Sequence, residues 1–159
     1  MMSTKTLIYI AGPTGVGKTK TSIALAKAFD TEIISCDSRQ FYQEMQIGTA
    51  VPSKEELAAV KHHFIQSKSV NENYTVADFE TEALQTVERL FKEKDTLIMV
   101  GGSGMYADAV MFGMDKFPEK LLKPFYSVSL IKDVELVSNL FRDLRIFIHS
   151  KHDCIGIHT

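Results

Sequence analysis

The residues with the clearest chemistry lie close to the N-terminus, directly after an apolar run. They form a phosphate loop of the type G-x-x-x-x-G-K-T. The glycines let this loop wrap until successive backbone N–H groups point at an anion, while its lysine reaches the same oxygens and its threonine is placed to ligate Mg²⁺. The helix expected after it adds a partial positive charge. The motif predicts a ligand with a di- or triphosphate and leaves hydrolase, kinase and transferase open; the alternative is a ligand-free glycine-rich turn. The sequence is a complete G-x-x-x-x-G-K-T phosphate loop, Gly12-Pro13-Thr14-Gly15-Val16-Gly17-Lys18-Thr19.

A carboxylate, Asp37, follows a second apolar run. An aspartate at the carboxyl end of a strand, on the same side of the sheet as the loop, can accept a proton from an attacking amine or hydroxyl. The alternative role is structural, as a loop cap or helix N-cap. The next residues, Ser38, Arg39 and Gln40, either read a second substrate or form a solvated turn.

The apolar run from Leu97 to Val100 ends in Gly101-Gly102-Ser103-Gly104. Motor and signalling NTPases usually place an Asp or Glu at the end of such a strand, to hold Mg²⁺ or to position water. This sequence has glycines there, which argues against an ATP hydrolase.

The elements that must position these groups alternate along the chain. We expect strands over 6–11, 32–36 and 96–100, and helices over 18–29 and 53–61 and through 79–91, the last with Thr75 and Asp78 as a cap pair. Strands separated by helices imply a parallel sheet covered on both faces, with ligands at the carboxyl ends of its strands. The expected fold is therefore a three-layer α/β phosphate-loop fold. The first helix is expected to turn four residues inward: Ile23, Leu25, Ala26 and Phe29.

Length and composition favour one domain, because 159 residues leave little room for a second full core. The formal charge of −2 argues against bulk electrostatic binding to nucleic acid and leaves a local basic groove open. Cys36 and Cys154 lack metal-type spacing and predict free thiols in a reducing compartment. With no signal peptide and no apolar run of membrane length, we expect a cytoplasmic protein that does not enter a membrane.

The texture of the sequence changes after Phe117-Pro118. We expect residues 1–117 to form the catalytic core and residues 118–159 an atypical tail, which is an insertion, a lid, or a truncated or frame-shifted C-terminal part. Residues 132–143 have some helical potential, and the apolar residues 155–157 have no obvious partner. A native protein of about twice this mass is the expected sign of truncation.

Several motifs in this order resemble the tRNA dimethylallyltransferases, also called tRNA isopentenyltransferases. A phosphate loop alone is weak evidence, whereas this ordered set spans nearly three-quarters of the chain. The matching segments are Gly12 to Thr19, Asp37 to Tyr42, Ile47 to Ala50, His62-His63, Tyr74 to Phe79, and Gly101 to Tyr106.

The resemblance implies transfer of a dimethylallyl group from dimethylallyl diphosphate to N6 of the adenosine 3′ of a tRNA anticodon. Lys18, the loop N–H groups and Thr19 with Mg²⁺ would then stabilise the departing diphosphate, and Asp37 would accept the N6 proton. The base must leave its stack. The residues implied to bind tRNA are Asp37, Ser38, Arg39, Gln40 and Ser103, in a protein expected to act as a monomer.

Other candidate residues have weaker patterns. His62-His63, expected on a helix, would point apart and form no chelate, so a structural role stays open beside a functional one. Phe41 and Tyr42 are expected to pack rather than to stack on bases. The tail residues that superficially resemble metal ligands lack a repeated spacing, so no metal site is expected there; they are His149, His152, Asp153, Cys154 and His158.

The resemblance stops after Pro118. Relatives continue with an insertion over the anticodon stem and an Asp- and Arg-rich helical segment, which Arg142 and Arg145 do not convincingly match. Three alternatives therefore stay open: an isopentenyltransferase acting on free adenine nucleotide, a phosphate-loop small-molecule kinase, and a diphosphate-binding fragment without turnover.

Overall fold

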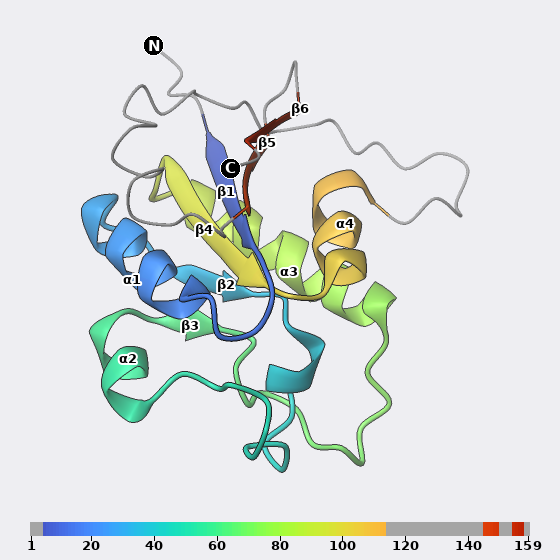
Figure 1. Ribbon diagram of the computed structural model, residues 1–159. Coiled ribbons are helices and arrows are strands. Elements are labelled where there is room, and N and C mark those ends of the chain that lie inside the picture. The colour runs from blue at the N-terminus through green and yellow to red at the C-terminus, as the bar shows by residue number, and fades with distance from the viewer. Residues whose placement is uncertain (1–4, 114–144, 150–153, 158–159) are drawn as a thin grey trace.

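A sheet with helices on both faces forms the centre of the computed structural model, which describes residues 5–113, 145–149 and 154–157 (Figure 1). The strand order is β3-β2-β4-β1-β5-β6, and the strands from β3 to β1 are mutually parallel. The expected α/β fold with a parallel sheet is thus confirmed. The strands are β1 (Thr6–Ala11), β2 (Ile33–Ser35), β3 (His62–His63), β4 (Thr96–Gly101), β5 (Arg145–His149) and β6 (Cys154–Ile157).

Side chains of the central strands alternate between two cores, because successive residues of a strand point to opposite faces. Leu7 and Tyr9 pack in the core that contains residues of α3 and α4, whereas Ile8 and Ile10 pack in the core that contains Ala26 of α1. Both faces are therefore covered, as parallel sheets require. The helices are α1 (Lys18–Ala28), α2 (Lys54–Ala59), α3 (Val76–Phe91) and α4 (Gly104–Phe112), with a 3₁₀ helix η1 (Ser38–Gln40).

Helix α3 begins where the predicted cap pair places it. The Thr75 hydroxyl accepts from the Asp78 backbone N–H, and the Asp78 carboxylate accepts from the Thr75 N–H in return. This capping box satisfies two backbone donors that a helix start leaves unpaired. Phe79, Ala83 and Val87 recur at helical spacing and are fully buried, which fixes the face that α3 turns toward the sheet.

Helix α1 differs from the expectation in one residue that it was predicted to bury. Phe29 is 41% exposed, since it lies at the C-cap where the chain leaves the helix. Ala26 is buried as predicted, and Ile23 and Leu25 are partly buried against the core that contains it. Thr21 and Ser22 are also buried, which was not predicted. The two hydroxyls donate to the carbonyls of Gly17 (3.1 Å) and Thr19 (2.8 Å), so their burial leaves no donor unpaired.

The histidine pair lies in a strand, which corrects the prediction that it lies on a helix. The helix predicted over residues 53–61 is present as α2, with Ser53 as its N-cap, but it ends at Ala59. His62 and His63 then pair with Ile33 and Ile34 of β2. Adjacent residues of a strand point to opposite faces, so the prediction that the two rings form no chelate agrees with their placement.

The apolar segments of the tail form the two antiparallel strands of the sheet. β5 pairs with β1, and β6 pairs with β5, with Ile146 opposite Ile157 and Ile148 opposite Ile155. The last apolar segment, which had no obvious partner in the sequence, therefore pairs with the one before it. The predicted boundary at residues 117–118 and the helical potential of 132–143 lie outside the described residues.

Candidate active site

The phosphate loop connects β1 to α1 in the conformation that its glycines predict. Gly15 (φ 89°) and Gly17 (φ 95°) have left-handed backbone, which is costly for residues with a side chain. Gly17 is the N-cap of α1 and provides no side-chain cap, in contrast to Ser53 and Thr75 at the starts of α2 and α3. The first N–H groups of α1 thus lack the capping oxygen that α2 and α3 have, and a phosphate oxygen can take that place.

Lys18 lies folded along this loop. Its Nζ donates to the carbonyl oxygen of Pro13 at 2.7 Å. Partial burial lowers the pKa of Lys18 from its ordinary value, while the Asp37 carboxylate acts in the opposite direction. The two charged groups therefore influence each other across the site.

Asp37 lies at the carboxyl end of β2 and serves as the N-cap of η1. Its Oδ1 accepts from the backbone N–H of Arg39 at 3.1 Å, and its carbonyl accepts from the N–H of Gln40 at 3.0 Å. The structural interpretation of this residue is thus confirmed. The same side chain also lines the cavity beside the loop, so capping and exposure to a ligand occur together.

The end of β4 approaches Asp37 closely because Gly101 has no side chain. A Cβ atom at Gly101 would lie 2.5 Å from Sγ of Cys36 and 2.9 Å from the backbone nitrogen of Asp37. Just beyond, the hydroxyls of Ser38 and Ser103 lie 3.3 Å apart. The glycine-rich turn after β4 therefore packs directly against the turn that carries Asp37.

A cavity of about 260 Å³ joins these groups. From the predicted phosphate-binding set it is lined by Thr14, Gly15, Gly17, Lys18 and Thr19, and not by Gly12, Pro13 or Val16. From the predicted tRNA-binding set, Asp37 and Gln40 line it, while Ser38 and Ser103 contact each other and Arg39 is exposed. The structure thus brings the loop lysine, the loop threonine and the acid to one cavity.

Gln40 turns its side chain toward the neighbouring loop. Its Nε2 donates to the carbonyls of Thr49 (3.3 Å) and Ala50 (2.9 Å), and its Oε1 accepts from the Ser35 hydroxyl at 3.3 Å. These bonds use both ends of the amide. In this conformation Gln40 shapes the cavity wall by holding the segment around Ala50.

The far wall of the cavity was not predicted as part of the site, although His62 was one of the candidate residues. It contains Pro52 and Glu56 from the start of α2 together with His62 and Ile65. The Nδ1 of His62 is 2.8 Å from the Val60 carbonyl oxygen, and its buried Nε2 has no hydrogen-bond partner among the described residues. Burial lowers the pKa of His62. No spacing in the sequence connects these residues to the loop, since only the folded sheet brings β3 beside β2.

His63 and the aromatic pair have structural contacts. His63 Nε2 is 2.5 Å from a carboxylate oxygen of Glu32. Phe41 is buried and its ring stacks on Phe79 at 5.0 Å between centroids, and Tyr42 is partly buried against the same core. The prediction that Phe41 and Tyr42 pack rather than present a stacking surface agrees with this placement.

In the part of the chain that the structure describes, no three His, Cys, Asp or Glu side chains lie close enough together to hold a metal ion. The tail residues His149, His152, Asp153, Cys154 and His158 have side chains outside the described set. Cys36 is buried, which raises the pKa of its thiol to about 12. Among the described helices, none combines the length and apolar character that crossing a membrane requires.

The fold and the site together define a phosphate-loop α/β protein with an acid after the strand β2 and glycines after the strand β4. The sequence matches the family model described as IPP transferase over residues 40–145. The chain belongs to the IPP transferase family.

Two relatives of this chain are named tRNA dimethylallyltransferase. It is 63% identical over 115 residues to a tRNA dimethylallyltransferase of Flavobacterium johnsoniae and 61% identical over 118 residues to that of Flavobacterium psychrophilum. These matches cover 72% and 74% of this chain, but only 37% and 38% of the relatives. The chain thus spans less than two-fifths of the length of these curated relatives.

Solved structures show the same fold. A tRNA isopentenylpyrophosphate transferase from Bacillus halodurans has a TM-score of 0.67 at 35% identity, covering 86% of this chain and 44% of that one. A eukaryotic dimethylallyltransferase acting on tRNA has a TM-score of 0.64 at 32% identity, covering 76% of this chain and 31% of that one.

Proposed function

We propose that this chain forms the donor-binding and proton-accepting part of a tRNA dimethylallyltransferase. The reaction is transfer of the dimethylallyl group of dimethylallyl diphosphate to N6 of the adenosine 3′ of the anticodon. The observation that carries the proposal is the single cavity lined by Lys18, Thr19 and Asp37, in a chain of this family. A tRNA substrate makes the cytoplasm the expected compartment, and the expected acting form is a monomer.

Family membership argues against a small-molecule kinase, because the sequence matches the IPP transferase family model over residues 40–145.

The loop supplies the anion-binding side of the proposed mechanism. Loop N–H groups and the α1 N-terminus would bind the diphosphate, and Lys18 would leave the Pro13 carbonyl to reach the same oxygens. Donors aimed at the oxygen that gains charge lower the barrier as the allylic C–O bond breaks. Lys18 therefore acts on the leaving group rather than on the nucleophile.

Thr19 fits the Mg²⁺ expected with a diphosphate. Its side chain lines the cavity, and Mg²⁺ in such sites needs only one or two protein oxygens, with phosphates and waters completing its octahedron. The lack of a clustered ligand set among the described residues is compatible with that mode. When bound, Mg²⁺ would add Lewis-acid stabilisation of the diphosphate charge.

Asp37 supplies the proton acceptor. As N6 of adenosine forms its bond to the allylic carbon, the C–O bond to diphosphate breaks, and the amine loses one proton to the Asp37 carboxylate. Neutral adenine N6 is a weak nucleophile, so alignment and leaving-group stabilisation are expected to provide much of the rate. The capping bond from Arg39 holds the carboxylate at the cavity edge.

The test is transfer of labelled dimethylallyl from its diphosphate, with Mg²⁺, to unmodified tRNA bearing adenosine 3′ of the anticodon. Label on the tRNA that disappears in Asp37→Ala and Lys18→Ala supports the proposal. Label on free AMP instead selects the free-nucleotide alternative. Retained diphosphate binding without label on either acceptor identifies a binding fragment.

A further inference from the structure

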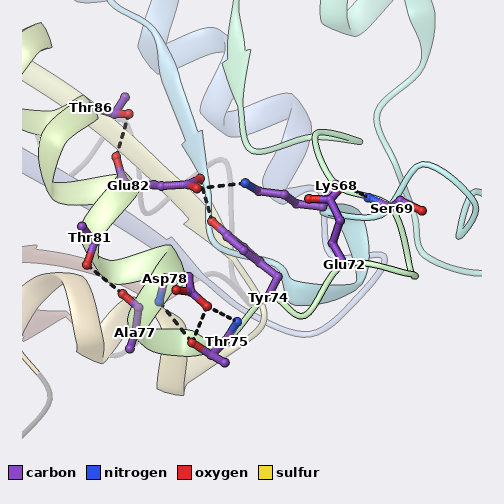
Figure 2. Close-up of polar contacts among 10 residues, drawn as sticks. All are labelled: Lys68, Ser69, Glu72, Tyr74, Thr75, Ala77, Asp78, Thr81, Glu82 and Thr86. Carbon is purple, nitrogen blue, oxygen red and sulfur yellow. Dashed lines mark hydrogen bonds and ion pairs between the residues drawn. The ribbon is translucent and has the colours of Figure 1, made fainter.

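Three side chains, two from the loop between β3 and α3 and one from α3, form a closed polar cluster (Figure 2). Lys68 Nζ lies 2.9 Å from one carboxylate oxygen of Glu82, the Tyr74 hydroxyl donates to the other at 3.0 Å, and Lys68 Nζ lies 4.3 Å from the Tyr74 ring centroid. Burial and the Glu82 carboxylate raise the pKa of Tyr74, so its hydroxyl stays a donor. The Lys68 side chain is only 18% exposed, whereas that of Glu82 is 42% exposed, so the ion pair is shielded from solvent mainly on the lysine side.

The cluster ties the loop between β3 and α3 to the second turn of α3, and that loop is strained. Phe64 (φ 63°) and Gln66 (φ 48°) both have left-handed backbone, which is uncommon for residues with a side chain. Such conformations persist only where surrounding contacts hold them, and they gather at functional sites. The Lys68–Glu82–Tyr74 cluster is one side-chain anchor next to this strained segment, and the Ser69 hydroxyl, which donates to the Glu44 carboxylate at 2.6 Å, is another.

The same loop bonds to the residues that follow the Asp37 turn. The Gln66 N–H donates to the Gln40 carbonyl at 2.7 Å, and the Lys68 N–H donates to the Phe41 carbonyl at 2.9 Å. The Gln43 N–H donates back to the Lys68 carbonyl at 2.9 Å. Lys68 therefore holds the chain after η1 with its backbone while its side chain holds α3.

We propose that Lys68 and Glu82 are positioning residues for Asp37. The path runs from Glu82 on α3 through Lys68 and Gln66 to Gln40, whose N–H donates to the Asp37 carbonyl at 3.0 Å. None of the three cluster side chains lines the cavity, so they act on a ligand only through the turn. The assignment rests on the proposed function for the role of Asp37 and goes beyond it in naming what holds that residue.

The variants are Lys68→Met, which removes the charge, Lys68→Arg, which keeps it, and Glu82→Gln as a milder break of the same pair. Glu88→Gln is the matched control, because Glu88 is an exposed glutamate on the same helix. The first readout is amide hydrogen exchange at Arg39, Gln40 and Gln66, which needs no turnover. The second is binding of inorganic diphosphate with Mg²⁺, and the third is the kcat and KM of prenyl transfer.

We expect exchange at these amides to rise about tenfold in Lys68→Met, less in Glu82→Gln, and not in Lys68→Arg or Glu88→Gln. Diphosphate affinity should stay within twofold, and kcat should fall about tenfold with an unchanged KM for the prenyl donor. Unchanged exchange in a folded Lys68→Met or Glu82→Gln overturns the proposal, as does an equal loss of diphosphate affinity. If neither the wild type nor any variant transfers label but the exchange pattern holds, the proposed function fails and the positioning path stands.

Discussion

The phosphate loop and the turn that carries Asp37 lie at the same edge of the sheet, but different contacts hold them. The loop is held locally, by left-handed glycines and by bonds such as Lys18 Nζ to Pro13, five residues apart. The Asp37 turn is held by distant parts of the chain, including Ser103, 65 residues from its partner Ser38. Anion binding is therefore a property of a short segment, whereas the position of the acid depends on the whole fold.

The largest expected effect separates the two regions by removing the acid. We expect Asp37→Asn to lower the rate of prenyl transfer by about 10²- to 10⁴-fold, the usual contribution of a general base. Diphosphate affinity should stay the same or rise slightly, because a negative charge near Lys18 is lost. Single-turnover transfer and calorimetric titration measure the two quantities, with Asp108→Asn, an exposed aspartate of α4, as control. Loss of diphosphate binding in Asp37→Asn would show that the two regions are not separable.

The reciprocal change affects the loop. Lys18→Met should weaken binding of inorganic diphosphate by about 10- to 100-fold, as expected for loss of a hydrogen bond from a charged donor. The fold should be unaffected, because the hydrogen bond that Lys18 Nζ makes within the described part of the chain is the one to the Pro13 carbonyl, at an exposed site. Lys27→Met, on the exposed last turn of α1, is the control for loss of charge. Equal affinity in the Lys18 and Lys27 variants would contradict the assigned role of the loop.

A smaller effect is expected where the glycine-rich turn after β4 meets the turn that carries Asp37. In Gly101→Ala the new methyl would collide with Cys36 and with the Asp37 backbone, so β4 or the turn must shift. We expect stability to fall by about 1–3 kcal/mol, as for overpacked cores, and transfer to slow about tenfold with diphosphate affinity retained. Gly102→Ala is the matched control, because the nearest atom to its added Cβ lies at 3.8 Å. The same loss of rate in both variants would argue against a steric effect on Asp37.

The sequence predicted what depends on local patterns. The loop, the strands β1 and β4, the Thr75–Asp78 cap and the α3 core face follow from motif, apolar runs and helical spacing. Phe29 was misplaced because helical periodicity does not show where the helix ends. Thr21 and Ser22 were not predicted to be buried because hydrophobicity does not show a hydroxyl bonded to its own helix.

What the sequence missed depends on pairing between distant segments. A two-residue strand such as β3 has too short a pattern to distinguish from a helix end, and its place beside β2 is a tertiary fact. The wall with Pro52, His62 and Ile65 follows from that pairing.

The smallest predicted effect concerns the far wall of the cavity, where His62 lies. Burial lowers the pKa of His62, and the nearby Glu56 carboxylate partly opposes the shift. Since the unfolded chain then binds the proton more tightly, the stability that the neutral ring contributes is present above its unfolded value near 6.5 and is lost as pH falls through the lower folded value. The loss should stay below about 1 kcal/mol, because solvent screens a partly exposed ring.

His62→Asn removes this titration while its amide can still donate to the Val60 carbonyl, the bond that orients the ring. Melting temperatures between pH 8 and pH 5 should therefore fall less in the variant than in the wild type. Below about pH 4.5 both should fall in parallel, because the carboxylates with lowered pKa, such as Glu32 and Asp78, begin to lose their contribution there. Identical slopes above pH 5 would mean that the ring does not stay neutral in the fold. A flatter slope in the variant would show that burial keeps the His62 ring neutral in the fold.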